Sequence, residues 1–177
     1  MSVMIVGEAF GAEEEIQGKP FVGKSGQLLS KIFAECGVDR NLVHITNVFM
    51  QRPPDNNVMF FFAGFKGDIC EDVSNYNGKY LQEKFRFELQ RLQSEIDQRK
   101  PKLIMSLGNV PYWCFTGNSG GITRARGTIQ KETFGPVKLQ TTYIPTYHPS
   151  YMLRNLTNKK LMDEWRSDIM NITSYLE

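Results

Sequence analysis

The stretch GEAFGAEEEIQGKPFVGKSGQLL, Gly7–Leu29, decides the fold, because it contains two patterns that predict different proteins. Its second half, GKPFVGKS at Gly18–Ser25, has the letters of a phosphate-binding P-loop. A P-loop needs a strand that leads directly into the glycine turn, so that the next helix points its N–H groups at phosphate. The preceding residues, FGAEEEIQ, are acidic and do not read as a strand. A nucleotide hydrolase is therefore the least favoured class.

Outside this stretch, short apolar runs alternate with amphipathic segments, which predicts an α/β sheet with mostly parallel strands. The expected strands cover Val3–Val6, Val43–Asn47, 102–108 and part of Val137–Thr146. The expected helices cover 26–37, 79–100, Val110–Phe115 and about Lys159–Ile172. The acidic residues after the first strand are expected to be irregular. Residues 55–78, rich in Phe, Gly and Asn, break the alternation and are expected to form an insertion.

The bulk composition is that of an ordinary soluble domain. A chain of 177 residues fits one domain, 1–177, and 41% hydrophobic with 23% charged residues is typical of globular proteins. No apolar run approaches the roughly 20 residues that span a bilayer, and the first residues do not resemble a signal peptide. We therefore expect a cytoplasmic protein without a membrane partner. The three cysteines are far apart, so neither a metal site nor a disulfide framework is expected.

The charge is unevenly distributed. Net charge is +2, yet residues 99–160 contain ten Lys and Arg against one acid, Glu132. Such a basic segment fits a polyanionic partner such as DNA, although basic loops are also often merely solvated.

Ligand sites in parallel sheets gather in the loops beyond the carboxyl ends of the strands. Three such loops are chemically unusual: GEAFG after the first strand, NVFMQRPP after the second, and the HPS segment after the last. These loops are the predicted active site.

Five blocks, in order, resemble the uracil-DNA glycosylase superfamily, and most closely its iron–sulfur branch, family four. They are GEAFGAEEEIQGKPFVGKSGQLL, ITNVFMQRPP, KPKLIMSLGNV, ITRARG and YHPSYMLR. The resemblance spans almost the whole chain except the insertion. It implies a three-layer α/β/α fold with a central, mostly parallel four-stranded sheet. It also implies an enzyme of base excision, which flips a nucleotide out of DNA and hydrolyses the N-glycosidic bond of uracil or another altered pyrimidine.

The resemblance assigns roles to single residues. Phe21 would stack on the base, Asn47 would bind its N3 and O4 edge, and His148 would donate to O2 as negative charge develops there. Each has a plainer alternative: a core phenylalanine, an asparagine that caps its own turn, and a histidine satisfied before proline. Glu8 would orient the attacking water or face the cationic sugar. Glu14 is a second candidate for water positioning, or a member of a solvated acidic run.

Further residues are assigned to the base pocket and to DNA. Gly7, Ala9 and Phe10 belong to the loop that lines the pocket. Met152 or Leu153 is the expected wedge that fills the gap left by the flipped base. The remaining expected DNA contacts, mostly to phosphate, are Ser25, Gly26, Arg126, Ser150 and Arg154. Lys24 of the apparent P-loop would then meet DNA phosphate beside Ser25.

The sequence departs from the family at the iron–sulfur cluster. The family uses four cysteines, two of them upstream of the first motif, where this chain has only six residues. The third aligns with Gln51, and the fourth falls near Glu88. Thiolate ligation is impossible at these positions, so we expect no cluster and no other cofactor or metal.

Two alternatives stay open. Phe10 replaces the proline of the family's G-E-x-P-G loop, and the insertion follows Asn47 closely, so the substrate could be a bulky hydroxymethylated or glucosylated base of phage DNA, excised in antiviral defence. The fold could also serve as a non-catalytic DNA-binding module, although such a module has no need of Glu8, Asn47 and His148 together. A monomer is the expected state.

Overall fold

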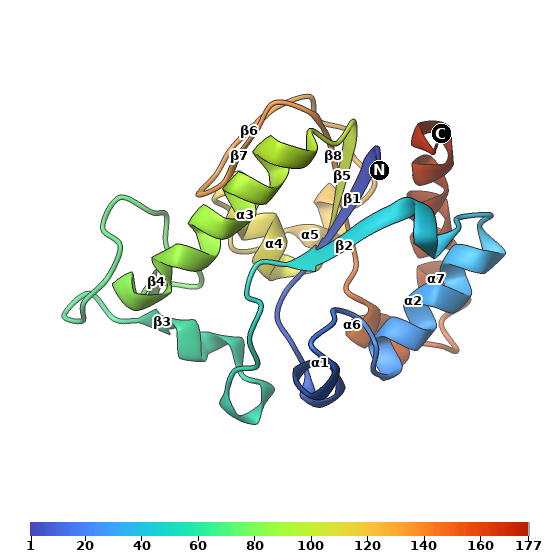
Figure 1. The fold of residues 1–177 in the computed structure, drawn as a ribbon. Helices are drawn as coiled ribbons and strands as arrows, with labels where there is room; N and C mark the ends of the chain where they lie inside the picture. Colours follow the sequence, from blue (N-terminus) through green and yellow to red (C-terminus); the bar gives the residue numbers. More distant parts are fainter. Residues whose placement is uncertain (177) are drawn as a thin grey trace.

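The computed structural model describes residues 1–176, so Glu177, the last residue of the expected domain, lies outside the described part. Four parallel strands form the central sheet: β1 (Val3–Gly7), β2 (Val43–Asn47), β5 (Leu103–Leu107) and β8 (Thr142–Thr146). Their order is β2-β1-β5-β8 (Figure 1). In β1, β5 and β8 every residue is buried, as expected of strands covered on both faces.

Helices cover both faces of this sheet (Figure 1). On one face, α3 (Arg86–Arg99) and α4 (Asn109–Thr116) pack through a core that includes Leu92 and Trp113. On the other, α2 (Lys24–Glu35) and α7 (Lys159–Met170) pack through a core that includes Phe33 and Trp165. The predicted three-layer α/β/α fold class is confirmed.

Two expectations for local structure were wrong. The acidic segment after β1 is a helix, α1 (Ala12–Gln17), in which three glutamates occupy the first turn and favour the positive end of the helix dipole. The helix expected from residue 79 begins at Arg86, after a 3-10 turn at Glu83–Phe85. Residues Tyr80–Leu81 instead form strand β4, where Leu81 pairs with Phe62 of β3 (Phe62–Ala63).

The apparent P-loop joins two helices. Gly18, at φ +66°, ends α1, and Gly23 is the N-cap of α2. The helix before the loop replaces the strand that a P-loop requires, which agrees with the rejection of the nucleotide-hydrolase reading.

Residues 55–78, the expected insertion, together with β4 form an arm. The arm packs next to the core that contains Leu92 and Trp113. Its 3-10 turns, Pro54–Asn56 and Val58–Phe61, lead into the β3–β4 ladder, which lies away from the sheet in Figure 1. Phe61 stacks on Phe49, with 3.9 Å between ring centroids, and buries the base of the arm. Phe65, in contrast, is 73% exposed.

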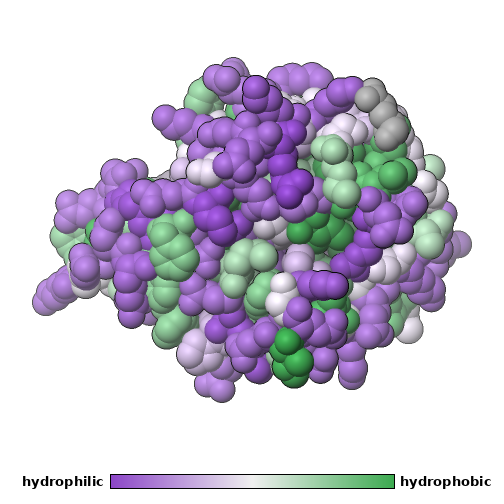
Figure 2. Space-filling model, in the orientation of Figure 1, coloured by the Kyte–Doolittle hydropathy of each residue, from purple (hydrophilic) through white to green (hydrophobic). Residues whose placement is uncertain are grey.

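The remaining short elements lie in the connections. They are the 3-10 turns Arg40–Leu42 and Asn171–Tyr175, helices α5 (Ile122–Ala125) and α6 (Pro149–Leu153), and strands β6 (Thr133–Phe134) and β7 (Lys138–Leu139). The face shown in Figure 2 is largely hydrophilic, with small separate apolar patches. Within residues 1–176, no helix is both long and apolar enough to cross a bilayer.

Candidate active site

The loops that follow β1, β2 and β8 meet around a cavity of about 350 Å³. Glu8 from the loop after β1, Asn47 at the end of β2 and His148 from the loop after β8 line it together with Phe21. The predicted pocket residues Ala9, Phe10 and Glu14 line it as well, as do Lys24, Ser25 and Ser150. The structure therefore brings the predicted catalytic and base-binding side chains to one place.

Asn47 is the last residue of β2, opposite Gly7 in β1. Its side chain is 1% exposed, yet its Oδ1 has no hydrogen-bond partner among residues 1–176. An unpaired buried amide oxygen costs about 1–3 kcal/mol, so it needs an explanation. Gly7 makes the arrangement possible, because a Cβ there would lie 2.4 Å from both this oxygen and the Phe21 ring. The alternative of an asparagine that caps its own turn does not describe this oxygen.

Phe21 forms one wall of the cavity and has a strained backbone. Its φ is +53°, a region that non-glycine residues rarely adopt. The ring is 5% exposed, and its centroid lies 5.9 Å from that of His148. Gly26, a predicted DNA contact, is instead buried beneath Phe21, where a Cβ would come within 1.9 Å of the Phe21 carbonyl oxygen.

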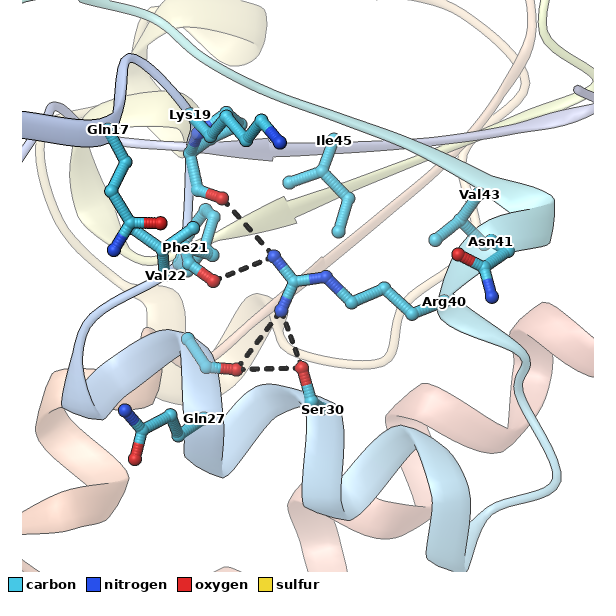
Figure 3. A pocket seen from close by; sticks show the side chains of 12 residues that line it. Gln17, Lys19, Phe21, Val22, Gln27, Ser30, Arg40, Asn41, Val43 and Ile45 are labelled. Carbon is cyan, nitrogen blue, oxygen red and sulfur yellow. Dashed lines mark hydrogen bonds between the residues drawn. The ribbon is translucent and has the colours of Figure 1, made fainter. Parts of the chain in front are cut away.

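Arg40 binds the backbone carbonyls of this strained segment, residues 20–21 (Figure 3). Its Nη2 donates to the carbonyl oxygens of Pro20 and Phe21, at 3.2 and 2.7 Å. Its Nη1 donates to Gly26 O at 3.2 Å and Ser30 Oγ at 2.5 Å. Arg40 lies in a larger hollow of about 810 Å³, which is lined by Phe21 but by none of Glu8, Asn47 or His148. Sequence reasoning missed Arg40, because its partners are mostly backbone carbonyls that leave no sequence signature.

Glu14 holds the same segment from the other side. Its Oε1 accepts hydrogen bonds from the N–H groups of Val22 and Gly23, at 3.1 and 3.0 Å. With 9% exposure, Glu14 is not a member of a solvated acidic run. It fastens α1 to the start of α2, and its predicted role in water positioning stays a prediction.

Glu8 is a partly buried carboxyl group in the loop after β1. Burial raises its pKa to about 7, because the charged form is poorly solvated there. Tyr76, from the expected insertion, lines a neighbouring cavity of about 350 Å³ together with Glu8. Burial, and next the charge of Glu8, raise the pKa of Tyr76 to about 12, so its phenol stays neutral. Sequence reasoning did not include Tyr76, which has no motif around it.

His148 is the N-cap of α6, and its ring is oriented by Ser150. The Ser150 N–H donates to His148 Nδ1 at 3.0 Å, and Ser150 Oγ lies 2.7 Å from the same nitrogen. Because Nδ1 accepts, the neutral ring carries its proton on Nε2. Burial, and next the nearby Arg154 charge, lower the pKa of His148 to about 4. The side chain is thus a neutral N–H donor at pH 7.

The other predicted DNA contacts separate into two groups. Arg154 is exposed and lines the neighbouring cavity with Ser150, where phosphate could reach it. Arg126, in contrast, is committed to Asp168 through two hydrogen bonds of 2.8 and 2.5 Å, and Asp168 is only 2% exposed. Met152 is fully buried, whereas Leu153 is partly exposed, so Leu153 is the better placed of the two wedge candidates.

The residues at the two testable cluster positions do not fit an iron–sulfur cluster. Gln51 Nε2 donates to Glu88 Oε1 at 3.1 Å, and the Met50 N–H donates to the same oxygen at 3.1 Å. Glu88 is 2% exposed. An amide and a carboxylate that bind each other supply no thiolate ligand.

Comparison with known proteins agrees with this geometry. The profile of the Uracil DNA glycosylase superfamily matches residues 1–169. The chain is 32% identical over 158 residues to the Type-4 uracil-DNA glycosylase of Thermotoga maritima, covering 89% of this chain and 69% of that protein. It is 32% identical to the protein of that name from Sulfurisphaera tokodaii (92% and 66% covered), and 31% identical to that from Pyrobaculum aerophilum (96% and 75% covered). This chain therefore belongs to the uracil-DNA glycosylase superfamily.

Proposed function

We propose that this chain is a DNA glycosylase that hydrolyses the N-glycosidic bond of uracil flipped out of DNA and leaves an abasic site. The observation that carries the proposal is the buried Oδ1 of Asn47, which has no hydrogen-bond partner within the described residues 1–176, in a cavity with one aromatic wall. A site with an unpaired buried polar atom discriminates strongly in favour of a ligand that pairs with it. The relatives named uracil-DNA glycosylases support uracil as that ligand.

The pocket offers the contacts that a flipped pyrimidine needs. Phe21 supplies an apolar wall on which the base stacks. The Asn47 amide has an acceptor for the uracil N3–H and a donor for O4, and both atoms belong to one buried side chain. The His148 Nε2–H donates to O2, where negative charge collects as the base leaves.

The reaction uses water as the nucleophile and Glu8 as the base. The water oxygen forms a bond to C1′ while the C1′–N1 bond breaks, and the electron pair of that bond leaves with the base. One water proton passes to the Glu8 carboxylate, whose pKa of about 7 suits proton transfer near neutral pH. The uracil anion, held by His148, takes up a proton from solvent after release.

Base release from short DNA, followed by alkaline cleavage of the abasic product, tests the proposal. The panel contains single- and double-stranded DNA, each carrying one of four bases: uracil, hydroxymethyluracil, hydroxymethylcytosine or glucosylated hydroxymethylcytosine. We expect cleavage at uracil, about 10²–10⁴-fold slower in Glu8→Gln and about 10–100-fold slower in Asn47→Ala. Glu15→Gln, the same change on an exposed neighbour in α1, should leave the rate unchanged.

Three outcomes contradict the proposal in different ways. Cleavage only at a bulky modified base would replace uracil as the substrate. DNA binding without any base release would favour a binding module. Loss of activity in Glu15→Gln equal to that in Glu8→Gln would remove the special role of Glu8.

A further inference from the structure

We infer that Arg91 is a positioning residue that holds the end of β2, so that Asn47 meets the base in the correct orientation. The inference rests on the proposed function and adds to it a residue outside the pocket. Arg91 lies on α3, which covers one face of the sheet. It is not among the residues that line either cavity around Glu8.

The first observation is a direct contact to the backbone of Asn47. Arg91 Nη2 donates to Asn47 O at 2.6 Å and to Val48 O at 3.0 Å. β2 is the edge strand of the sheet, so its outer side needs partners other than a strand. The guanidinium supplies charged donors at the point where the chain leaves the sheet and the Asn47 side chain enters the pocket.

The second observation is that carboxylates fix the Arg91 side chain itself. Its Nε donates to Glu88 Oε2 at 3.0 Å, and its Nη1 donates to Glu95 Oε2 at 2.7 Å. Glu88 also accepts from Met50 N–H and Gln51 Nε2 through its other oxygen. The Arg91–Glu88 pair therefore binds residues 47–51 at both ends, and charge-assisted bonds of this kind are about twice as strong as neutral ones.

The third observation is the place of this network in the fold. By the resemblance to the iron–sulfur branch, Gln51 stands at the position of one cluster cysteine, and Glu88 lies near that of another. Here hydrogen bonds from Met50 N–H and Gln51 Nε2 to Glu88 join the loop after β2 to the helix α3, and an ion pair within α3 links Glu88 to Arg91. The connection between these segments is thus made by side chains of the protein itself. Such a network holds the loop only while every member is present, because removing one partner leaves a buried charge unpaired.

Arg91→Met tests the inference, because it keeps the length of the side chain and removes the donors. Arg86→Met is the matched control: Arg86 lies on the same helix, but its side-chain hydrogen bonds in the described part of the chain go to Asp72 and Glu83, not to residues 47–51. At a temperature well below unfolding, we expect kcat for uracil release to fall at least tenfold in Arg91→Met and less than twofold in Arg86→Met. Arg91→Lys, which keeps a donor and the charge, should recover part of the loss.

A double-mutant cycle separates positioning from general destabilisation. If Arg91 acts through Asn47, Arg91→Met should lower kcat by less than threefold in the Asn47→Ala background. Independent, multiplicative losses would overturn the inference. Should Arg91→Met fail to fold, Arg91→Lys is taken through the same cycle.

Hydrogen exchange gives a readout that does not depend on activity. We expect a peptide covering residues 46–52 to exchange faster in Arg91→Met than in wild type, and to be unchanged in Arg86→Met. Unchanged exchange together with unchanged kcat in Arg91→Met would overturn the positioning role, while the wild-type rate keeps the glycosylase proposal. A wild type inactive on every DNA would refute the glycosylase proposal, and faster exchange would still support the hold of Arg91 on residues 47–51.

Discussion

Glu8 is the residue whose ionisation should control the rate. Burial raises its pKa to about 7, so the carboxylate, which we propose accepts the water proton, is the minor form at pH 5 and the major form at pH 9. We expect kcat/KM for uracil release to rise about tenfold per pH unit below 7 and to level off above it. His148, with a pKa of about 4, stays neutral across this range. A profile that is flat from pH 5 to 9 would contradict this assignment, and Glu8→Gln should lack the rise.

The same burial of Glu8 should destabilise the protein at high pH. The pKa of Glu8 is higher in the folded than in the unfolded state. The contribution of the neutral carboxyl to the free energy of unfolding is therefore fully present at low pH and is lost as pH rises through about 7. Gln is neutral at every pH. The free energy of unfolding of Glu8→Gln relative to wild type should therefore increase by about 2–3 kcal/mol between pH 5 and 9. Urea unfolding at both values measures it, and Glu15→Gln should show no such trend.

The backbone conformation of Phe21 should depend on Arg40, although Arg40 does not line the cavity around Glu8. In Arg40→Met the carbonyls of Pro20 and Phe21 lose the guanidinium donor, the Gly26 carbonyl keeps its bond from Ser30 Oγ, and the strained backbone of Phe21 can relax. We expect base release to slow about tenfold and the free energy of unfolding to fall by about 2 kcal/mol. The control is Arg166→Met, which breaks a surface pair with Glu35. Equal effects of the two changes would argue against a special role for Arg40.

At the scale of elements, residues 55–78 contribute Tyr76 to the cavity that adjoins Glu8. The Tyr76 ring centroid lies 5.9 Å from that of Trp113, and Tyr76 lines the second cavity together with Glu8. Tyr76→Ala should admit water to Glu8, lower its pKa toward the ordinary value of 4.5, and move the acid limb of kcat/KM to lower pH. It should also destabilise the fold by about 3 kcal/mol. Phe65→Ala, at an exposed site on the same arm, should change neither quantity.

Elements with one dominant signal were predictable from sequence, and elements with weak signals were not. The strand Val43–Asn47 was predicted with its observed bounds, because a β-branched apolar run buried in a parallel sheet has few other readings. Helix α1 was missed because its sequence, AEEEIQ, contains a single large apolar residue, Ile16, and so has no apolar periodicity. In the structure Ile16 is 77% exposed, and it forms no buried face of the helix. The start of α3 was misplaced because Leu81 continues the helical spacing, although it pairs with Phe62 in a ladder.

The candidate active site likewise contains residues that the sequence predicted and residues that it did not. Glu8, Asn47 and His148 were assigned through the resemblance to the superfamily, and the ends of the predicted parallel strands pointed to the same edge of the sheet. Arg40 and Arg91 were not found, because both act on backbone carbonyls that only the folded chain brings within reach. Side chains that hold a site from behind are therefore the part that a single sequence does not reveal.

At the scale of the whole molecule, the basic residues between 99 and 160 should make DNA binding depend on salt, but not all of them should contribute. Arg154 is exposed beside the second cavity, whereas Arg126 is neutralised by Asp168. In Arg154→Gln, the slope of log Kd against log salt should fall in magnitude by about one, because one phosphate contact is lost. Binding of uracil DNA to protein that also carries Glu8→Gln measures this slope while the substrate remains intact.

Arg126→Gln is the matched change, and it should separate charge from structure. The slope of log Kd against log salt should stay that of the Glu8→Gln protein, because the Arg126 guanidinium binds the Asp168 carboxylate and does not bind phosphate. The free energy of unfolding should instead fall by about 3 kcal/mol, because Asp168, which also accepts from Thr146 Oγ1, becomes a buried carboxylate without its cation. If both variants reduced the slope equally, Arg126 would leave Asp168 to bind DNA, and the ion pair would open when the duplex arrives.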